Sequence, residues 1–184
     1  MTTDRPVTTG ELPFDLADPT LAAGIRAGLE RVEDVLHSVL DNDIEFASDL
    51  YRGTAAYYDR YRLPYPDAMI ADLMGRAAPS GRGRLLDLAC GTGQLAFPLA
   101  PWFAEVWAVD SEPDMIDVVR AKAAGAGPYG ARIQAAALKA EELRVDPGSF
   151  ELIVIGNAFH RLKRERVAQR AYDWLPPGRC LALC

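Results

Sequence analysis

The chain has 184 residues, of which 49% are hydrophobic and 25% are charged, so we expect a packed domain rather than a disordered chain. The formal net charge of -6 and the pI near 5.0 argue against a nucleic-acid binder, which normally presents a basic face. Three cysteines and two histidines show no paired spacing, so they indicate neither a disulfide framework nor a metal site.

The N-terminal part predicts a flexible arm followed by helices. Residues 1–19 contain three prolines and a glycine among polar residues, a composition typical of an arm. Residues 20–78 predict a helical extension, with apolar spacings of three and four and a proline-containing break before the last helix. Its three helices are expected at 21–39, 44–61 and 67–77.

From residue 79 to residue 184 the pattern changes to short apolar runs alternating with helical stretches. Helices are expected from about residue 94, at 112–127 and at 164–175. Strands are expected at 84–89, 105–110, 131–137, 150–156 and 179–184. This alternation predicts an α/β fold: a Rossmann-like, doubly wound parallel sheet of about five strands, with helices on both faces.

Two acids mark the ends of the first two predicted strands. Asp87 lies in the first, just before the glycine turn Gly91-Thr92-Gly93, and Asp110 ends the second, nineteen positions after Gly91. Open parallel sheets bind ligands beyond the carboxyl ends of their strands. A carboxylate at position 110 can accept hydrogen bonds from both hydroxyls of a ribose. A helix cap at Asp110 is the alternative interpretation.

Two classes of cofactor fit this turn. "GTGQLA" satisfies the G-x-G-x-x-A dinucleotide pattern, which keeps a dinucleotide-dependent oxidoreductase as an alternative. A pyrophosphate would lie at the turn in such an enzyme, and Asp87 would repel it. S-adenosylmethionine carries no phosphate and has an ammonium group that an acid there would attract.

Several motifs resemble those of class I S-adenosylmethionine-dependent methyltransferases that act on small molecules. "LLDLACGTG" and "VWAVDSEPDMI" resemble the first two motifs of the family, and "AEEL", "GSFELIVIGNAFHRL" and "RAYDWLPPGRCLAL" continue the match. Upstream, "GTAAYYDRYRLPYP" resembles the segment that often folds over the cofactor. The resemblance spans roughly residues 46–184. It implies a methyltransferase that uses S-adenosylmethionine and has a small-molecule acceptor. The polar N-terminus does not resemble a secretory signal, so we expect a cytoplasmic protein.

The resemblance also implies roles for individual residues. Asp87 would act on the methionine amino group and Asp110 on the ribose, while Lys139 stands where many members carry a polar or acidic residue. The full implied cofactor-binding set is Asp87, Ala89, Gly91, Thr92, Gly93, Asp110, Ser111, Met115, Ala140, Glu141 and Asn157. No metal ligand is implied.

Other candidates have two interpretations each. His160, past the end of the fourth strand, could act as a general base because imidazole titrates near neutral pH, or it could only pack locally. Tyr57, Tyr58 and Tyr61 could roof the site, or their spacing of three and four could form an ordinary helix stripe. Arg62, assigned with them to the lid, could meet the cofactor carboxylate or be a solvated arginine.

The chain ends at Cys184 within the fifth predicted strand, whereas the sheet of the family continues, so the resemblance implies a C-terminal truncation. One hypothesis is an active enzyme. The other is a catalytically impaired cofactor-binding or interaction module. We expect a homodimer to be possible through the fifth strand, whose edge would be exposed, or through the N-terminal helices. We expect no nucleic-acid partner because the net charge is negative. We expect no membrane partner, since no stretch approaches the roughly 20 apolar residues of a membrane span.

Overall fold

The structure is a computed structural model, and it describes residues 51–184. The predicted arm at 1–19, the first predicted helix and the start of the second lie outside the described residues. Five strands form the sheet: β1 (Arg84–Leu88), β2 (Glu105–Asp110), β3 (Ile133–Ala137), β4 (Leu152–Ile155) and β5 (Cys180–Leu183).

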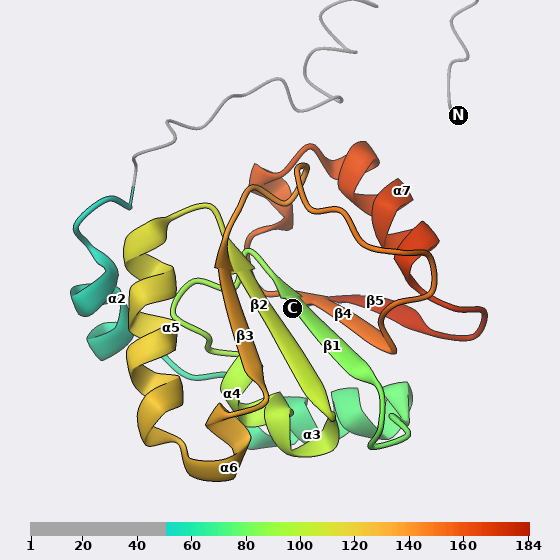
Figure 1. Ribbon diagram of the computed structural model, residues 1–184, viewed down its shortest axis with the longest axis horizontal. Helices are drawn as coiled ribbons and strands as arrows, with labels where there is room; N and C mark the ends of the chain where they lie inside the picture. Colours follow the sequence, from blue (N-terminus) through green and yellow to red (C-terminus); the bar gives the residue numbers. More distant parts are fainter. Residues whose placement is uncertain (1–50) are drawn as a thin grey trace, which may run out of the picture. The chain divides into compact units, whose positions relative to one another are not determined.

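The strands pair in the order β3-β2-β1-β4-β5, and every neighbouring pair is parallel (Figure 1). The chain enters at the central strand β1, builds outward through β2 and β3, and then returns to the other side of β1 for β4 and β5. This is the doubly wound order, and it confirms the fold class predicted from the sequence. The reversal of direction lies between β1 and β4, where such sheets bind ligands.

Helices cover both faces of the sheet. The longer ones are α3 (Asp67–Ala77), α5 (Pro113–Gly125) and α7 (Arg164–Trp174). Shorter elements are α2 (Ala55–Tyr61), α4 (Ala96–Leu99), α6 (Gly127–Gly130) and the 3₁₀ turns η1 (Ala100–Trp102) and η2 (Phe159–Arg161). In Figure 1, α3, α4 and α5 lie on one side of the sheet and α7 on the other. No helix among residues 51–184 is long and apolar enough to cross a membrane.

Two buried cores, one on each face, follow from the alternation of side chains along the strands. Leu85 and Val106 point into the core under α3, α4 and α5, together with Ile70 of α3. Leu86 and Ile153 point into the core under α7. The central strands β1 and β4 therefore carry apolar side chains on both faces, which is why each is an almost unbroken apolar run.

The helix expected from residue 94 is shorter than predicted. Residues 91–95 form turns, α4 spans only Ala96–Leu99, and η1 takes over from Ala100. Pro98 and Pro101 explain this, because proline lacks the N–H group that continues an α-helix. The expected helix at 112–127 likewise divides at Gly127, where φ is +59°, into α5 and α6.

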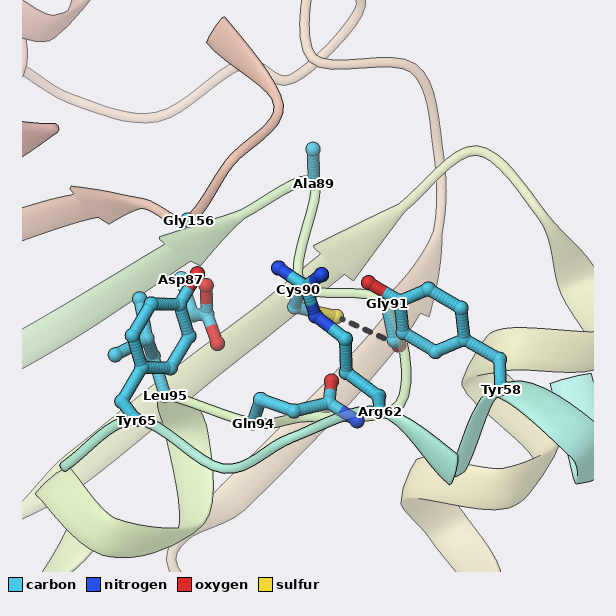
Figure 2. A pocket seen from close by; sticks show the side chains of 10 residues that line it. All are labelled: Tyr58, Arg62, Tyr65, Asp87, Ala89, Cys90, Gly91, Gln94, Leu95 and Gly156. Atoms are coloured by element: carbon cyan, nitrogen blue, oxygen red, sulfur yellow. Dashed lines mark hydrogen bonds between the residues drawn. The ribbon is translucent and has the colours of Figure 1, made fainter. Parts of the chain in front are cut away.

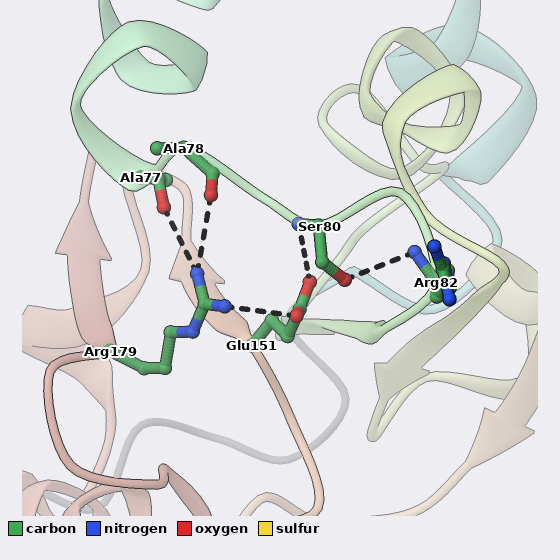
Figure 3. Close-up of polar contacts among 6 residues, drawn as sticks. All are labelled: Ala77, Ala78, Ser80, Arg82, Glu151 and Arg179. Atoms are coloured by element: carbon green, nitrogen blue, oxygen red, sulfur yellow. Dashed lines mark hydrogen bonds and ion pairs between the residues drawn. The ribbon is translucent and has the colours of Figure 1, made fainter.

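An ion-pair network joins the segments at the amino ends of the central strands (Figure 3). Arg179 donates to Oε1 of Glu151 at 3.0 Å and to the carbonyl oxygens of Ala77 and Ala78 at 3.4 and 3.3 Å. The other carboxylate oxygen of Glu151 accepts from the N–H of Ser80 at 3.0 Å. The network fastens the end of α3 to the starts of β4 and β5, at the end of the sheet opposite the glycine turn.

Candidate functional site

Asp87 is the buried acid of the site. It lies in β1, is 1% exposed, and its Oδ2 accepts a hydrogen bond from the N–H of Ala96 at 2.8 Å. Burial raises the pKa of Asp87 to about 7; the Ala96 hydrogen bond opposes this rise and the charge of Asp110 adds to it. A carboxyl group with this pKa is poised to ionise near neutral pH when a cation arrives.

The glycine loop between β1 and α4 has a conformation that ordinary residues rarely adopt. Ala89, Gly91 and Gly93 all have positive φ, at +57°, +55° and +87°. A Cβ atom on Gly93 would lie 2.7 Å from the ring of Phe97, so a side chain has no room there. The loop therefore reverses direction tightly at the carboxyl end of β1.

Asp110 holds the glycine loop against the end of β2. Its Oδ2 accepts from the N–H of Gly91 at 2.8 Å and its Oδ1 from the N–H of Glu112 at 2.9 Å. Burial raises the pKa of Asp110, and these backbone hydrogen bonds partly offset the rise. Each carboxylate oxygen still has a lone pair that a ligand hydroxyl can use. The N-cap of α5 is Glu112 and no side chain caps the helix, so Asp110 orders the segment before α5 rather than capping it, and its carboxylate can still accept from a ribose.

A narrow pocket lies over the loop (Figure 2). It has about 20 Å³ of free space, enough for about one water molecule. Tyr58 covers Gly91, with ring carbon Cε1 3.4 Å from where a Cβ of Gly91 would stand, and Tyr65 lies beside Asp87. The side chain of Arg62 extends from the end of α2 toward the loop. The lining residues are Tyr58, Arg62, Tyr65, Asp87, Ala89, Cys90, Gly91, Gln94, Leu95 and Gly156.

Two lining residues that the sequence analysis did not select form one wall. The hydroxyl oxygen of Tyr65 would lie 2.5 Å from a Cβ atom on Gly156, so only glycine at the end of β4 lets the ring approach so closely. Burial raises the pKa of Tyr65, and the neighbouring Arg62 opposes this rise. A glycine after a buried apolar run was the available signal for this wall.

The remaining cofactor candidates are distributed around this centre. Thr92 is fully buried in the loop, Met115 is buried in α5, and Ser111 is exposed after β2. Ala140 is buried beyond β3, whereas the side chain of Glu141 accepts from the N–H of Lys163 at 3.0 Å, at the start of α7. Glu141 therefore supports α7, whose first helical residue follows Lys163.

The candidates beyond β4 lie on an irregular segment. Asn157 is exposed, has φ of +48°, and donates its N–H to the carbonyl oxygen of Cys184 at 2.6 Å. His160 is exposed within η2. Of the three candidate lid tyrosines, only Tyr58 lines the pocket; Tyr57 and Tyr61 are 72% and 67% exposed.

Cys90 has the environment of a packing residue. Its thiol donates to the carbonyl oxygen of Gly91 at 3.4 Å, and the side chain is buried. Burial raises the pKa of Cys90 well above its ordinary value, and the charges of Asp87 and Asp110 act in the same direction. The thiol therefore stays neutral near pH 7 and is a poor nucleophile. In the part of the chain that the structure describes, no group of three or more His, Cys, Asp or Glu side chains could hold a metal ion.

A family model described as a methyltransferase domain matches residues 85–178, about half of the chain. An uncharacterized methyltransferase of Mycobacterium tuberculosis is 34% identical over 128 residues, which are 68% of this chain and 47% of the relative. A probable S-adenosylmethionine-dependent methyltransferase of Saccharomyces cerevisiae is 26% identical over 117 residues, 63% of this chain and 40% of the relative. The chain thus spans about half the length of the curated relatives it matches.

The fold also matches solved structures. The CcbJ methyltransferase from Streptomyces caelestis superposes with a TM-score of 0.62 and 26% identity, covering 75% of this chain and 58% of the other. The matched residues 85–178 contain the glycine loop, both acids and all of the sheet except β5 and the first residue of β1, so a methyltransferase domain accounts for these features.

Proposed function

The chain belongs to the class I S-adenosylmethionine-dependent methyltransferases, and on that premise we propose that it binds S-adenosylmethionine over the glycine loop and methylates a small molecule. One observation carries the proposal: a buried carboxylate, Asp87, accepts the hydrogen bond of the first helical N–H of α4, while Asp110 stands at the end of the neighbouring strand. Asp87 prepares the loop for a cation, and Asp110 prepares it for a ribose.

The arrangement of N–H groups disfavours the dinucleotide alternative. A pyrophosphate is normally bound by free N–H groups at a glycine loop and helix N-terminus. Here the N–H of Ala96 is donated to Asp87, that of Gly91 to Asp110, and that of Gly93 to the carbonyl oxygen of Cys90. A phosphate would meet the buried Asp87 and the half-buried Asp110 in place of those donors.

The residues present fit S-adenosylmethionine. Asp110 would accept from its ribose hydroxyls, Asp87 would face its ammonium group, and Arg62 would meet its carboxylate. Met115 and Ala140, both buried near the end of β2 and beyond β3, are suited to the adenine. When bound, the cofactor supplies an activated methyl group on a cationic sulfonium.

The chain's own part in methyl transfer would be positioning and exclusion of water. Tyr58 and Tyr65 close over the loop from the segment that follows residue 51, and they leave little space for solvent. Positioning of two reactants and removal of water can supply much of the acceleration in such a reaction. His160 is the candidate for taking a proton from a hydroxyl or amine acceptor.

The net charge of the chain supports the choice of acceptor class in this proposal. A net charge of -6 favours a small molecule over a nucleic acid, whose phosphates the protein would repel. The second candidate function is a cofactor-binding or interaction module without turnover. A cytoplasmic location and dimerisation through β5 remain part of the proposal.

Two measurements test the function. Calorimetric titration with S-adenosylhomocysteine should show binding, and radiolabelled methyl transfer to a metabolite extract should label a small molecule. The Asp110→Ala variant should lose both signals, while Asp117→Ala, an exposed acid on α5, should keep them. Binding without transfer would favour the module. Absence of binding at millimolar ligand would refute both functions.

A further inference from the structure

Besides the tyrosine contacts in the pocket, three polar or cation–π contacts join residues 51–65, which we call the lid segment, to the core. The N–H of Gly53 donates to Oδ2 of Asp114 at 2.8 Å, at the start of α5. Arg161 of η2 lies 4.7 Å from the ring centroid of Tyr51, across the carboxyl end of the sheet. The third contact is the most polar and involves the glycine loop directly.

Lys122 of α5 makes this third contact. Its ammonium group donates to Oδ1 of Asp59, in α2, at 2.6 Å and to the carbonyl oxygen of Thr92 at 2.9 Å. It also lies 4.9 Å from the ring centroid of Phe97, the ring that abuts Gly93. One ammonium group therefore joins α5, the lid segment's helix α2 and the middle of the glycine loop.

The contact involves the side chain of Thr92 as well as its backbone. Burial alone would raise the pKa of Asp59, but hydrogen bonds from Lys122 and Thr92 bring it below its ordinary value. The hydroxyl oxygen of Thr92 also accepts from Nε2 of Gln94 at 2.6 Å. Thr92 is fully buried and does not line the pocket, so its side chain serves the lid contact.

We propose that Lys122 is a positioning residue. Together with Asp59 it joins the lid segment to the carbonyl oxygen of Thr92, and this contact, which we call the latch, holds the lid segment and the glycine loop in the arrangement that binds the cofactor. Neither Lys122 nor Asp59 lines the pocket, while the lid residues Tyr58, Arg62 and Tyr65 do. The latch thus acts on the cofactor through the residues that it places.

The free space in the pocket explains why a latch matters. Tyr58 and Tyr65 of the lid segment narrow the pocket beside Asp87 to about 20 Å³. A ligand that binds there lies against these side chains, so its affinity depends on where the lid segment holds them. Apparent affinity falls by the fraction of molecules whose lid is not in the closed position. Losing the latch lowers that fraction.

The inference rests on the proposed function for its ligand, S-adenosylhomocysteine, and its test separates the two. Lys122→Met and Asp59→Asn should each weaken binding of S-adenosylhomocysteine about tenfold, since each removes one charged hydrogen bond of partial exposure. The double variant should bind no more weakly than either single variant, because both break the same contact. Lys122→Arg, which keeps a positive charge and N–H donors, should stay within about twofold of the unchanged protein.

The matched control is Arg76→Met, which removes an exposed ion pair of similar length on α3, with Asp72. Hydrogen exchange of the ligand-free full chain gives the second measurement. Backbone amides of α2 should exchange about tenfold faster in Lys122→Met and Asp59→Asn, and at the unchanged rate in Arg76→Met. A pair that served stability alone would lower the melting temperature and leave affinity unaltered below it.

Each outcome decides one claim. If the unchanged protein binds S-adenosylhomocysteine and the latch variants bind equally well, the latch is refuted and the methyltransferase function stands. If the unchanged protein does not bind it, the function fails, and hydrogen exchange alone judges the latch: unaltered exchange in α2 refutes it. Faster exchange together with weaker binding supports both.

Discussion

Affinity for S-adenosylhomocysteine should depend on pH through Asp87. Burial raises the pKa of Asp87 to about 7 in the ligand-free protein, so at pH 6 about one molecule in eleven has it ionised and at pH 8 about ten in eleven. An ammonium group binds the ionised form. The dissociation constant should therefore be about tenfold larger at pH 6 than at pH 8.

Calorimetry in buffers of different ionisation enthalpy measures the same event directly. Binding at pH 6 should release close to one proton per ligand, because the cation forces Asp87 to ionise. The Asp87→Asn variant isolates Asp87: it should bind more weakly at pH 8 and lose most of the slope. An unchanged slope in Asp87→Asn, or a flat profile in the original protein, would refute this account.

The ionisation of Asp87 also affects stability, in the opposite direction: a higher pH favours ligand binding but lowers the stability of the ligand-free protein. A pKa raised from 3.8 to about 7 means that the folded protein holds the Asp87 proton more tightly than the unfolded chain does. The stabilisation is fully present below about pH 4 and is lost as pH rises through about 7. Without ligand, the melting temperature should fall from pH 5 to pH 8, and less steeply in Asp87→Asn.

Three further variants test other parts of the structure. Asp110→Ala should weaken the binding of S-adenosylhomocysteine about a hundredfold in calorimetry, since it removes charged acceptors for two hydroxyls. A loss of affinity under threefold would contradict the ribose role. Gly93→Ala should lower the free energy of unfolding in urea by about 1–3 kcal/mol, because φ is +87° and the ring of Phe97 fills the space; an unchanged midpoint would count against that strain. Arg179→Met should lower the free energy of unfolding by about 1 kcal/mol and leave ligand affinity within about twofold, since its network lies at the other end of the sheet. A marked loss of affinity there would show that the two ends are coupled.

The sequence predicts most of the sheet because the signals for its strands are local. β2 coincides with the predicted 105–110, and β1 differs from its prediction only at Ala89, where the left-handed turn begins. Asp87 and Asp110 were identifiable because each stands at the end of an apolar run. Their meeting on the glycine loop follows from the parallel pairing of β1 with β2.

The contacts of the lid were not predictable in this way. Asp59 and Lys122 are 63 positions apart, and neither is unusual for a helix surface. Glu141 occupies a motif position, yet its carboxylate accepts from the N–H of Lys163, 22 positions further along. Such pairs depend on how helices pack on the finished sheet, and one sequence contains no periodic signal for them. Pro98 and Pro101, which shorten α4, are visible in the sequence, but the apolar pattern around them favours a longer helix.

The hydrogen bonds inside the glycine loop have a kinetic consequence. Gly91 and Gly93 donate their N–H groups to Asp110 and to the carbonyl oxygen of Cys90, so the loop is already ordered before a ligand reaches it. The ordering that accompanies binding then falls mainly on the lid segment. Association should accordingly proceed at the rate at which that segment opens and become independent of ligand concentration when ligand is plentiful.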